Sequence, residues 1–323
     1  MPRLSIIIRC YNEEEHIGRL LSGIMQQTEK DLEVILVDSG STDATLSIAS
    51  RYPVRVVHIS PKNFSFGRSL NTGCAAASGD FLVFASAHVY PIYEDWLEKL
   101  IKPLEEPRVA LSYGGQRGAT VTKYSEHQVF AHWFPEVSNS DQSHPFCNNA
   151  NAAVRRSVWE RFPYNEALTG LEDLDWATRV MRAGHKLAYV ADASIVHLHD
   201  ESPSRILNRY RREAIALHRI LPAERFSLLD FARLFTSNVA SDLFHAWHDG
   251  VLRPNLGSIA TFRLMQFWGT YQGFKQYGTV GKNLRQTFYY PRGMVRTGDK
   301  DAGSANGRQI DYSGHRNSEI SAG

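Results

Sequence analysis

The sequence has few cysteines and no long apolar segment. Its three cysteines, Cys10, Cys74 and Cys147, are far apart and show no CxxC spacing, which excludes a disulfide framework and a cysteine zinc site and favours a reducing compartment. No uninterrupted apolar run reaches the ~18 residues of a membrane span, and the first apolar segment turns polar at Asn12, before a signal-peptide core could form. We therefore expect a cytoplasmic protein, at most peripheral at the inner face of the cell membrane.

Charge is distributed unevenly along the 323 residues. Residues 1–204 contain 19 basic and 25 acidic side chains, whereas residues 205–298 contain 14 basic and 5 acidic ones. If the start of the second segment is helical, Arg205, Arg209 and Arg212 share one face. A solvated helix face explains this basic balance as well as contact with anionic phosphate or an anionic membrane does. Nucleic acid is not an expected partner, because no recognised binding motif accompanies the charge.

Strand-like and helix-like segments alternate in the first part of the chain. Short apolar runs predict strands at 4–9, 32–37, 54–59 and 80–85. The segments between them predict helices at 13–27, 43–51 and 67–77. This alternation predicts an α/β fold in which helices cover both faces of a parallel sheet, with ligands bound beyond the carboxyl ends of the strands.

The pattern changes near residue 204. Residues 1–204 form the predicted α/β domain, and we expect a helical carboxyl-terminal region over 205–290. Its helices are predicted at 203–221, 227–247 and 257–277. The segment 291–323 is rich in Gly, Ser and Asp and has few large apolar residues, so we expect it to be disordered.

Two of the predicted strands end in polar segments that a nucleotide could use. The first strand runs into residues 9–13, where the ring of Tyr11 could stack on a base. The second runs into Asp38, a glycine turn and Ser/Thr caps. An Asp in this position can accept a hydrogen bond from a base N–H or a ribose hydroxyl, although helix capping explains such a sequence equally well.

Taken in order, these segments resemble the opening of family 2 inverting glycosyltransferases, which include bacterial polysaccharide and lipopolysaccharide enzymes. The first reads Tyr-Asn-Glu-Glu from Tyr11, and the second reads Val-Asp-Ser-Gly-Ser-Thr-Asp from Val37. The resemblance continues through residues 67–84 and through Glu-Asp-Leu-Asp-Trp from Glu172, and it covers about residues 4–205. It implies a GT-A fold, a Rossmann-like architecture whose sheet is mixed but mainly parallel.

The same resemblance implies an activity and a set of site residues. A sugar would move, with inversion, from a UDP- or dTDP-sugar to a saccharide or lipid-linked glycan acceptor. Binding of the donor nucleotide is assigned to Arg9, Tyr11, Glu13, Asp38, Arg68 and Ser86. Binding of the acceptor is assigned to Asn149, Asn151 and Trp176.

The Asp-Xaa-Asp with which the family binds ribose and a divalent cation is replaced here by Ser86-Ala87-His88. The resemblance implies Mn²⁺ or Mg²⁺, but this replacement leaves metal dependence open. A neutral imidazole suits Mn²⁺ or another transition ion better than Mg²⁺, which prefers oxygen. His197 and His199 end a later strand and point to one face. Because similar family members place a metal- or diphosphate-contacting histidine at the first position, we predict His88 and His197 as metal ligands, with His199 as a substitute.

An acidic helix start carries the predicted catalytic residues. Inversion needs one carboxylate to remove the proton of the acceptor hydroxyl, and the family's general base corresponds to Asp173, beside Glu172. Together with Asp175 these are three carboxylates within four residues, which could raise the pKa of one of them. The alternative is that acidic residues merely favour the helix amino terminus.

Two other functions compete with glycosyl transfer. A catalytically degenerate nucleotide-sugar-binding protein is supported by the replaced Asp-Xaa-Asp. A sugar nucleotidyltransferase would need a Gly-rich, basic phosphate loop after the first strand, where this chain has three consecutive glutamates from Glu13. A dinucleotide-binding Rossmann domain is disfavoured, because no GxGxxG follows that strand.

Overall fold

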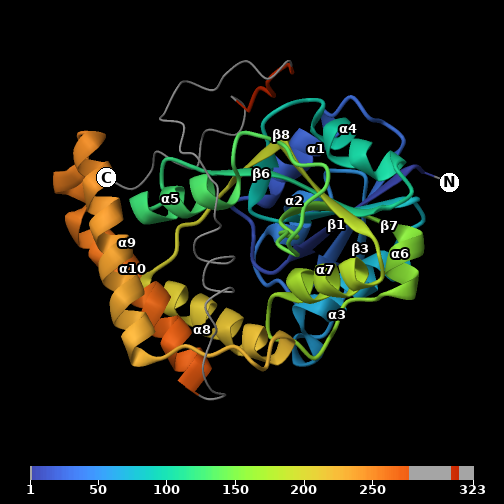
Figure 1. Cartoon of the computed structure of the whole chain (residues 1–323). Helices are drawn as coiled ribbons and strands as arrows, with labels where there is room; N and C mark the ends of the chain where they lie inside the picture. The colour runs from blue at the N-terminus through green and yellow to red at the C-terminus, as the bar shows by residue number, and fades with distance from the viewer. Residues whose placement is uncertain (1, 276–306, 313–323) are drawn as a thin grey trace.

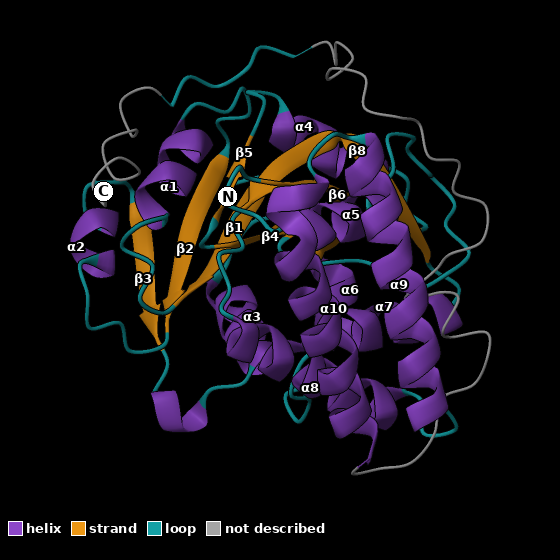
Figure 2. Cartoon of the chain, turned by 90° about the vertical axis from the view of Figure 1, so that its left-hand side faces the viewer, coloured by secondary structure: helices purple, strands orange, loops and turns teal. Residues whose placement is uncertain are grey.

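The computed structural model describes residues 2–275 and 307–312. Its centre is an eight-stranded sheet with the order β3-β2-β1-β4-β7-β6-β8-β5. Helices cover both faces of this sheet, and three long helices lie together at one side of it (Figures 1 and 2). The strands are β1 (Leu4–Cys10), β2 (Leu32–Asp38), β3 (Val54–His58), β4 (Phe81–Ser86), β5 (Val89–Pro91), β6 (Val109–Gly118), β7 (Asn151–Arg155) and β8 (Lys186–His197).

The helices differ widely in length. Those of the sheet domain are α1 (Ile17–Met25), α2 (Thr45–Ala49), α3 (Phe66–Ala76), α4 (Trp96–Ile101), α5 (Tyr124–Trp133), α6 (Arg156–Arg161) and α7 (Glu172–Arg182), with 3-10 turns η1 (Pro61–Asn63) and η2 (Lys102–Glu105). The three long helices are α8 (Pro203–Ile220), α9 (Leu228–His248) and α10 (Leu252–Lys275).

β1 is apolar because it is buried on both of its faces. Ile6 and Ile8 point into a core formed with α1, α2 and α4, whereas Ile7 points into a second core formed with α3, α6 and α7. Successive side chains of a strand alternate between faces, so a central strand with helices on both sides is mostly apolar, and β1 departs from this only at Ser5 and Arg9. Its two sheet neighbours, β2 and β4, both run parallel to it.

The register of these strands brings distant segments to one edge. Cys10 at the end of β1 pairs with Asp38 at the end of β2, and Arg9 pairs with Ser86 at the end of β4. β7 then runs antiparallel between β4 and β6, and β5 runs antiparallel to β8. The expectation of a mixed, mainly parallel sheet with helices on both faces is therefore confirmed.

The carboxyl-terminal helices form a unit that packs on the sheet domain. α10 contacts α8, α9 and α5, and glycines allow its close approach to α8, because a Cβ at Gly269 would lie 2.4 Å from the backbone oxygen of Leu207. A buried ion pair joins α9 to α10, with Arg263 Nε 2.7 Å from Asp242 Oδ2. None of the described helices is both long enough and apolar enough to cross a membrane.

The three arginines of the predicted basic face of α8 have different surroundings. Arg209 Nη2 lies 2.7 Å from Glu126 Oε1 of α5, and the guanidinium of Arg212 lies 4.6 Å from the centre of the Phe66 ring. Arg205 and Arg212 are exposed. Arg209 is therefore not available to an anionic surface, and contact of the other two with such a surface stays a prediction.

Residues 307–312 pack against the sheet domain. Gln309 forms a β-bridge with Tyr93, Ile310 is buried, and the hydroxyl of Tyr312 donates a hydrogen bond to the carbonyl of Pro91. The disorder expected for 291–323 does not hold for these six residues, because Ile310 and Tyr312 supply apolar side chains that the core can bury. The rest of that expectation lies outside the described residues.

Candidate active site

The two segments predicted to bind the nucleotide are tied together at the sheet edge. The side-chain oxygen of Asn12 accepts a hydrogen bond from the backbone N–H of Thr42, and the backbone N–H of Asn12 donates to Ser41 Oγ. Asn12 has a positive φ of 52°, a conformation that Asn tolerates better than most residues. The resulting turn leaves the neighbouring Tyr11 side chain 55% exposed, so its ring is free to stack.

Asp38 is buried at the end of β2 and shapes the turn that follows. Its two carboxylate oxygens accept hydrogen bonds from the backbone N–H groups of Gly40 and Ser41, and His58 Nδ1 lies 3.3 Å away. Burial alone would raise the pKa of Asp38, but the bonds from Ser41 and Gly40 lower it below its ordinary value. The residue is therefore a fixed negative charge beneath the turn, and its burial restricts direct contact with a ligand.

The acidic pair stands at the start of α7, opposite β1. Arg9 Nη1 of β1 lies 3.1 Å from Glu172 Oε1, and both side chains are largely buried. The preceding Leu171 has a φ of 54°, which is an unusual conformation for a bulky residue. Such strain persists only where the surroundings impose it, and here it turns the chain sharply into the helix that begins with Glu172 and Asp173.

Asp173 has the environment expected of a general base. Its carboxylate accepts hydrogen bonds from the backbone N–H groups of Asn149 and Leu174. Burial raises the pKa of Asp173, and the negative charge of Glu172 raises it further. The two N–H groups and Arg9 lower it in part, and the resulting pKa is about 7. A carboxylate with a pKa near neutral can both hold and release a proton at working pH.

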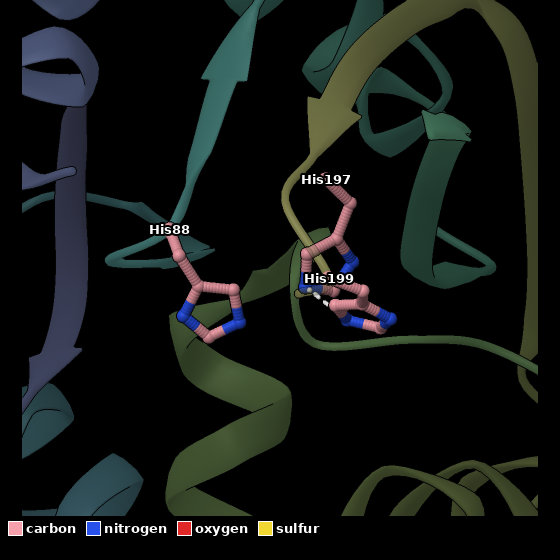
Figure 3. Close-up of side chains that lie close together, drawn as sticks. All are labelled: His88, His197 and His199. Atoms are coloured by element: carbon pink, nitrogen blue, oxygen red, sulfur yellow. Dashed lines mark hydrogen bonds between the residues drawn. The ribbon is translucent and has the colours of Figure 1, made fainter. Parts of the chain in front are cut away.

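Three histidines from two separate segments converge next to this edge. His88 follows β4, His197 ends β8, and His199 lies two residues further on; Figure 3 shows His88 facing the other two. One ligand atom from each ring lies within 4.8 Å of the others. His197 Nε2 and His199 Nε2 are 3.0 Å apart. Burial, with the nearby charged groups, lowers the pKa of His197 and of His199 well below the ordinary value, so both rings are neutral at neutral pH.

The donor set of this cluster fits a divalent cation. Neutral imidazole nitrogens bind Mn²⁺, Co²⁺ and Zn²⁺ but are poor ligands for Mg²⁺. Two ligands of one tetrahedral ion at 2.0–2.1 Å lie about 3.3 Å from each other, close to the Nε2 separation of His197 and His199. The fold therefore brings the predicted ligands His88 and His197 together. His199, which was predicted only as a substitute for one of them, lies in the same cluster.

Other predicted site residues have partners inside the protein. Glu13 Oε1 lies 3.0 Å from His88 Nδ1, so this side chain faces the histidines. Arg68 lies in the first turn of α3 and forms an ion pair with Glu166, 2.8 Å away. Ser86 is half-buried at the end of β4, at the shared edge.

The three residues predicted to bind the acceptor have different positions. Asn149 is buried beside Asp173, to which its backbone N–H donates. Asn151 is fully buried and bonds through its side chain to Trp96, Gly115 and Ala193. The Trp176 ring is also fully buried, and its Nε1 donates to the carbonyl of Phe162. For Asn151 and Trp176 the prediction of acceptor contact is therefore corrected, because neither side chain reaches the surface.

Sequence reasoning missed two residues beside the histidines, Gln116 and Glu126. Gln116 Oε1 lies 2.8 Å from His197 Nδ1, and Glu126 Oε1 lies 2.6 Å from His199 Nδ1. They are 81 and 73 positions from their histidines in the sequence and belong to a stretch that shows no clear periodicity. Only the fold brings these pairs together.

The chain is similar to known glycosyltransferase sequences. Residues 5–162 match the sequence profile of Glycosyl transferase family 2. The chain is 30% identical over 225 residues to the O-antigen chain rhamnosyltransferase WbaN of Salmonella anatum, covering 65% of this chain and 70% of that protein. It is 28% identical over 223 residues to the O-antigen chain rhamnosyltransferase RfbN of Salmonella typhimurium, covering 64% and 70% respectively.

Solved structures share the fold. A mannosyltransferase of Pyrobaculum calidifontis, solved with GDP-Man and Mn²⁺, superposes with a TM-score of 0.58 over 89% of this chain and 88% of its own, at 20% identity. TarS of S. aureus, residues 1–349 with UDP-GlcNAc, gives a TM-score of 0.51 over 82% of this chain and 90% of its own, at 16% identity. These likenesses identify the fold as GT-A.

The raised pKa of Asp173 should make the stability of the folded protein depend on pH. The folded protein keeps the proton of Asp173 up to about pH 7, whereas the unfolded chain releases it near pH 4. The stability of the wild-type protein should therefore fall as the pH rises between these values. Asparagine cannot ionise, so we expect Asp173→Asn to melt at least about 2 °C above wild type at pH 8, with the difference vanishing toward pH 4. Melting curves of both proteins across this range test it, and a difference that does not change with pH would contradict it.

Proposed function

Since the chain belongs to glycosyl transferase family 2, we propose that it moves a sugar, with inversion, from a nucleotide-diphosphate sugar to a saccharide or lipid-linked glycan. Asp173 is the general base in this proposal. The observation that carries it is the half-buried, high-pKa carboxylate of Asp173 near the edge where β1, β2 and β4 end together. Ligands of open α/β sheets bind at such an edge.

The donor nucleotide is proposed to lie across the ends of β1 and β2. The exposed Tyr11 ring stacks on the base, and the Asp38 turn supports the ribose. This orientation directs the diphosphate toward Ser86 and the histidines at the end of β4, since β4 lies on the other side of β1 from β2. UDP, dTDP and GDP all present a base that can stack in this way.

In the proposed chemical step, Asp173 accepts the proton of an acceptor hydroxyl as that oxygen attacks the anomeric carbon. The bond from this carbon to the diphosphate oxygen breaks on the opposite face, and the nucleoside diphosphate leaves with the bonding electrons. Arg9 neutralises Glu172 and keeps the pKa of Asp173 from rising further. A divalent cation held by His88, His197 and His199 would supply positive charge to the leaving diphosphate.

The names of the two Salmonella relatives support a donor and an acceptor class. Both are O-antigen chain rhamnosyltransferases, so dTDP-rhamnose is the first donor to test and a growing O-antigen saccharide is the first acceptor. UDP- and GDP-sugars are tested next as donors in the same screen for sugar transfer. A protein that binds these nucleotides without transferring or hydrolysing them would support the degenerate binding protein instead, and transfer of a nucleotidyl group would support the nucleotidyltransferase.

Asp173→Asn should retain donor binding but transfer sugar at least ~100-fold more slowly, because it lacks the general base. Asp175→Asn is the matched control. This carboxylate lies on the same helix but pairs with Arg179, 2.8 Å away, so transfer should change little. Initial rates with a saturating donor make the comparison. Similar rates for Asp173→Asn and Asp175→Asn would remove Asp173 from the mechanism.

Tyr11→Ala should weaken binding of free UDP and dTDP about tenfold or more, because one base–aromatic stack is lost. Tyr11→Phe keeps the ring and should bind nearly as wild type does. The Tyr11 side chain is 55% exposed, so neither change should disturb the fold. Calorimetric titration of both nucleotides gives the answer, and equal affinity in all three proteins would refute this placement of the base.

A further inference from the structure

The rings of the three histidines are each held from behind by a side-chain oxygen. His88 Nδ1 lies 3.0 Å from Glu13 Oε1, and His197 Nδ1 lies 2.8 Å from Gln116 Oε1. The third contact joins His199 Nδ1 to Glu126 Oε1 at 2.6 Å. An ionised carboxylate can only accept, so His88 and His199 donate from Nδ1. A neutral imidazole that carries its proton on Nδ1 has its lone pair on Nε2.

This tautomer points the lone pair of His199 Nε2 toward His197 Nε2. The two nitrogens lie 3.0 Å apart, within hydrogen-bond distance. A cation between them would take the place of the proton that they share. The arrangement is that of ligands prepared for a cation, with a hydrogen-bonding side chain behind each ring.

Glu126 is the most constrained of the three acceptors. Its side chain is 2% exposed, and the same Oε1 that faces His199 Nδ1 lies 2.7 Å from Arg209 Nη2. Arg209 Nη2 lies 2.7 Å from Glu201 Oε2 as well. Arg209 belongs to α8, so the carboxyl-terminal helices hold the carboxylate in place from outside the sheet domain.

We infer that Glu126, held by Arg209, is a positioning residue for the proposed cation site, because it fixes the tautomer that leaves His199 Nε2 free to bind. The site then has three imidazole ligands and takes a borderline transition-metal dication of the Co²⁺, Mn²⁺ or Zn²⁺ class in preference to Mg²⁺. This inference rests on the proposed role of the histidines in glycosyl transfer. It makes α8 part of the active site.

Co²⁺ is a suitable probe, because its visible spectrum reports nitrogen ligation directly. Wild-type protein titrated with Co²⁺ should develop strong visible bands that excess Mg²⁺ does not abolish. Glu126→Ala should lower the Co²⁺ affinity 10- to 100-fold. Glu126→Gln should recover most of it, since an amide oxygen still accepts the proton of His199 Nδ1. Asp200→Asn is the matched control, because it removes a neighbouring carboxylate that is 84% exposed and lies 4.0 Å from Lys123, and its Co²⁺ affinity should stay near that of wild type.

The tautomer itself can be read without any variant. In ¹⁵N-histidine-labelled protein without metal, long-range ¹H–¹⁵N spectra should show His199 protonated on Nδ1. Protonation on Nε2 would overturn the inference. So would Co²⁺ affinities that are equal in wild type and Glu126→Ala, or equally reduced in Glu126→Ala and Glu126→Gln.

The titration is made without sugar nucleotide, so it separates this inference from the proposed function. Sugar transfer by a protein that binds no Co²⁺ at the histidines would refute the inference and leave the function standing. Tight, Glu126-dependent Co²⁺ binding by a protein that transfers no sugar from any donor in the screen would refute the function and leave the site standing.

Discussion

The shared end point of β1, β2 and β4 is the constraint on which the site depends. Parallel pairing in register places Arg9 beside Ser86 and Cys10 beside Asp38, so the loops that follow these strands must open at one edge. α7 meets this edge through the Arg9–Glu172 ion pair, which joins residues 163 positions apart. A slip of one residue in β1 would turn Arg9 to the other face of the sheet, and it would remove the positive charge that Glu172 and Asp173 share.

The site has carboxylates in two places, at the start of α7 and behind the histidines. The carboxylates of Glu172 and Asp173 lie together at α7, where burial keeps one of them close to protonation. The proposed cation ligands are imidazoles, and the carboxylates of Glu13 and Glu126 lie one hydrogen bond further away, so more of the charge of a dication would act on a diphosphate. An Asp-Xaa-Asp would neutralise part of that charge. The replacement by Ser86-Ala87-His88 is therefore consistent with a cation site that keeps its position in the fold but uses imidazole ligands in place of carboxylates. Acceptors such as Glu126 hold these imidazoles in place.

Much of the sheet domain could be predicted from sequence, because its signals are local. Continuous apolar runs identify β1 to β4, and ordered motifs identify the strand ends that carry Tyr11 and Asp38. The histidine pair at 197 and 199 was found from the period of a strand. Gln116 and Glu126 could not be found, since their contacts depend on how β6 and α5 pack against β8. Asn151 and Trp176 were assigned to the acceptor site from their nearness to motifs, which does not reveal that their side chains point into the core.

The central claim is transfer with inversion by a single base, and the configuration of the first product tests it most directly. The purified protein is given the donor that it uses in the screen, with water or a saccharide as acceptor. Proton NMR then follows the anomeric signal of the product before mutarotation. The account predicts that the new bond has the anomeric configuration opposite to that of the donor. A product that retains the donor configuration would contradict it, because retention cannot arise from one displacement assisted by Asp173 alone.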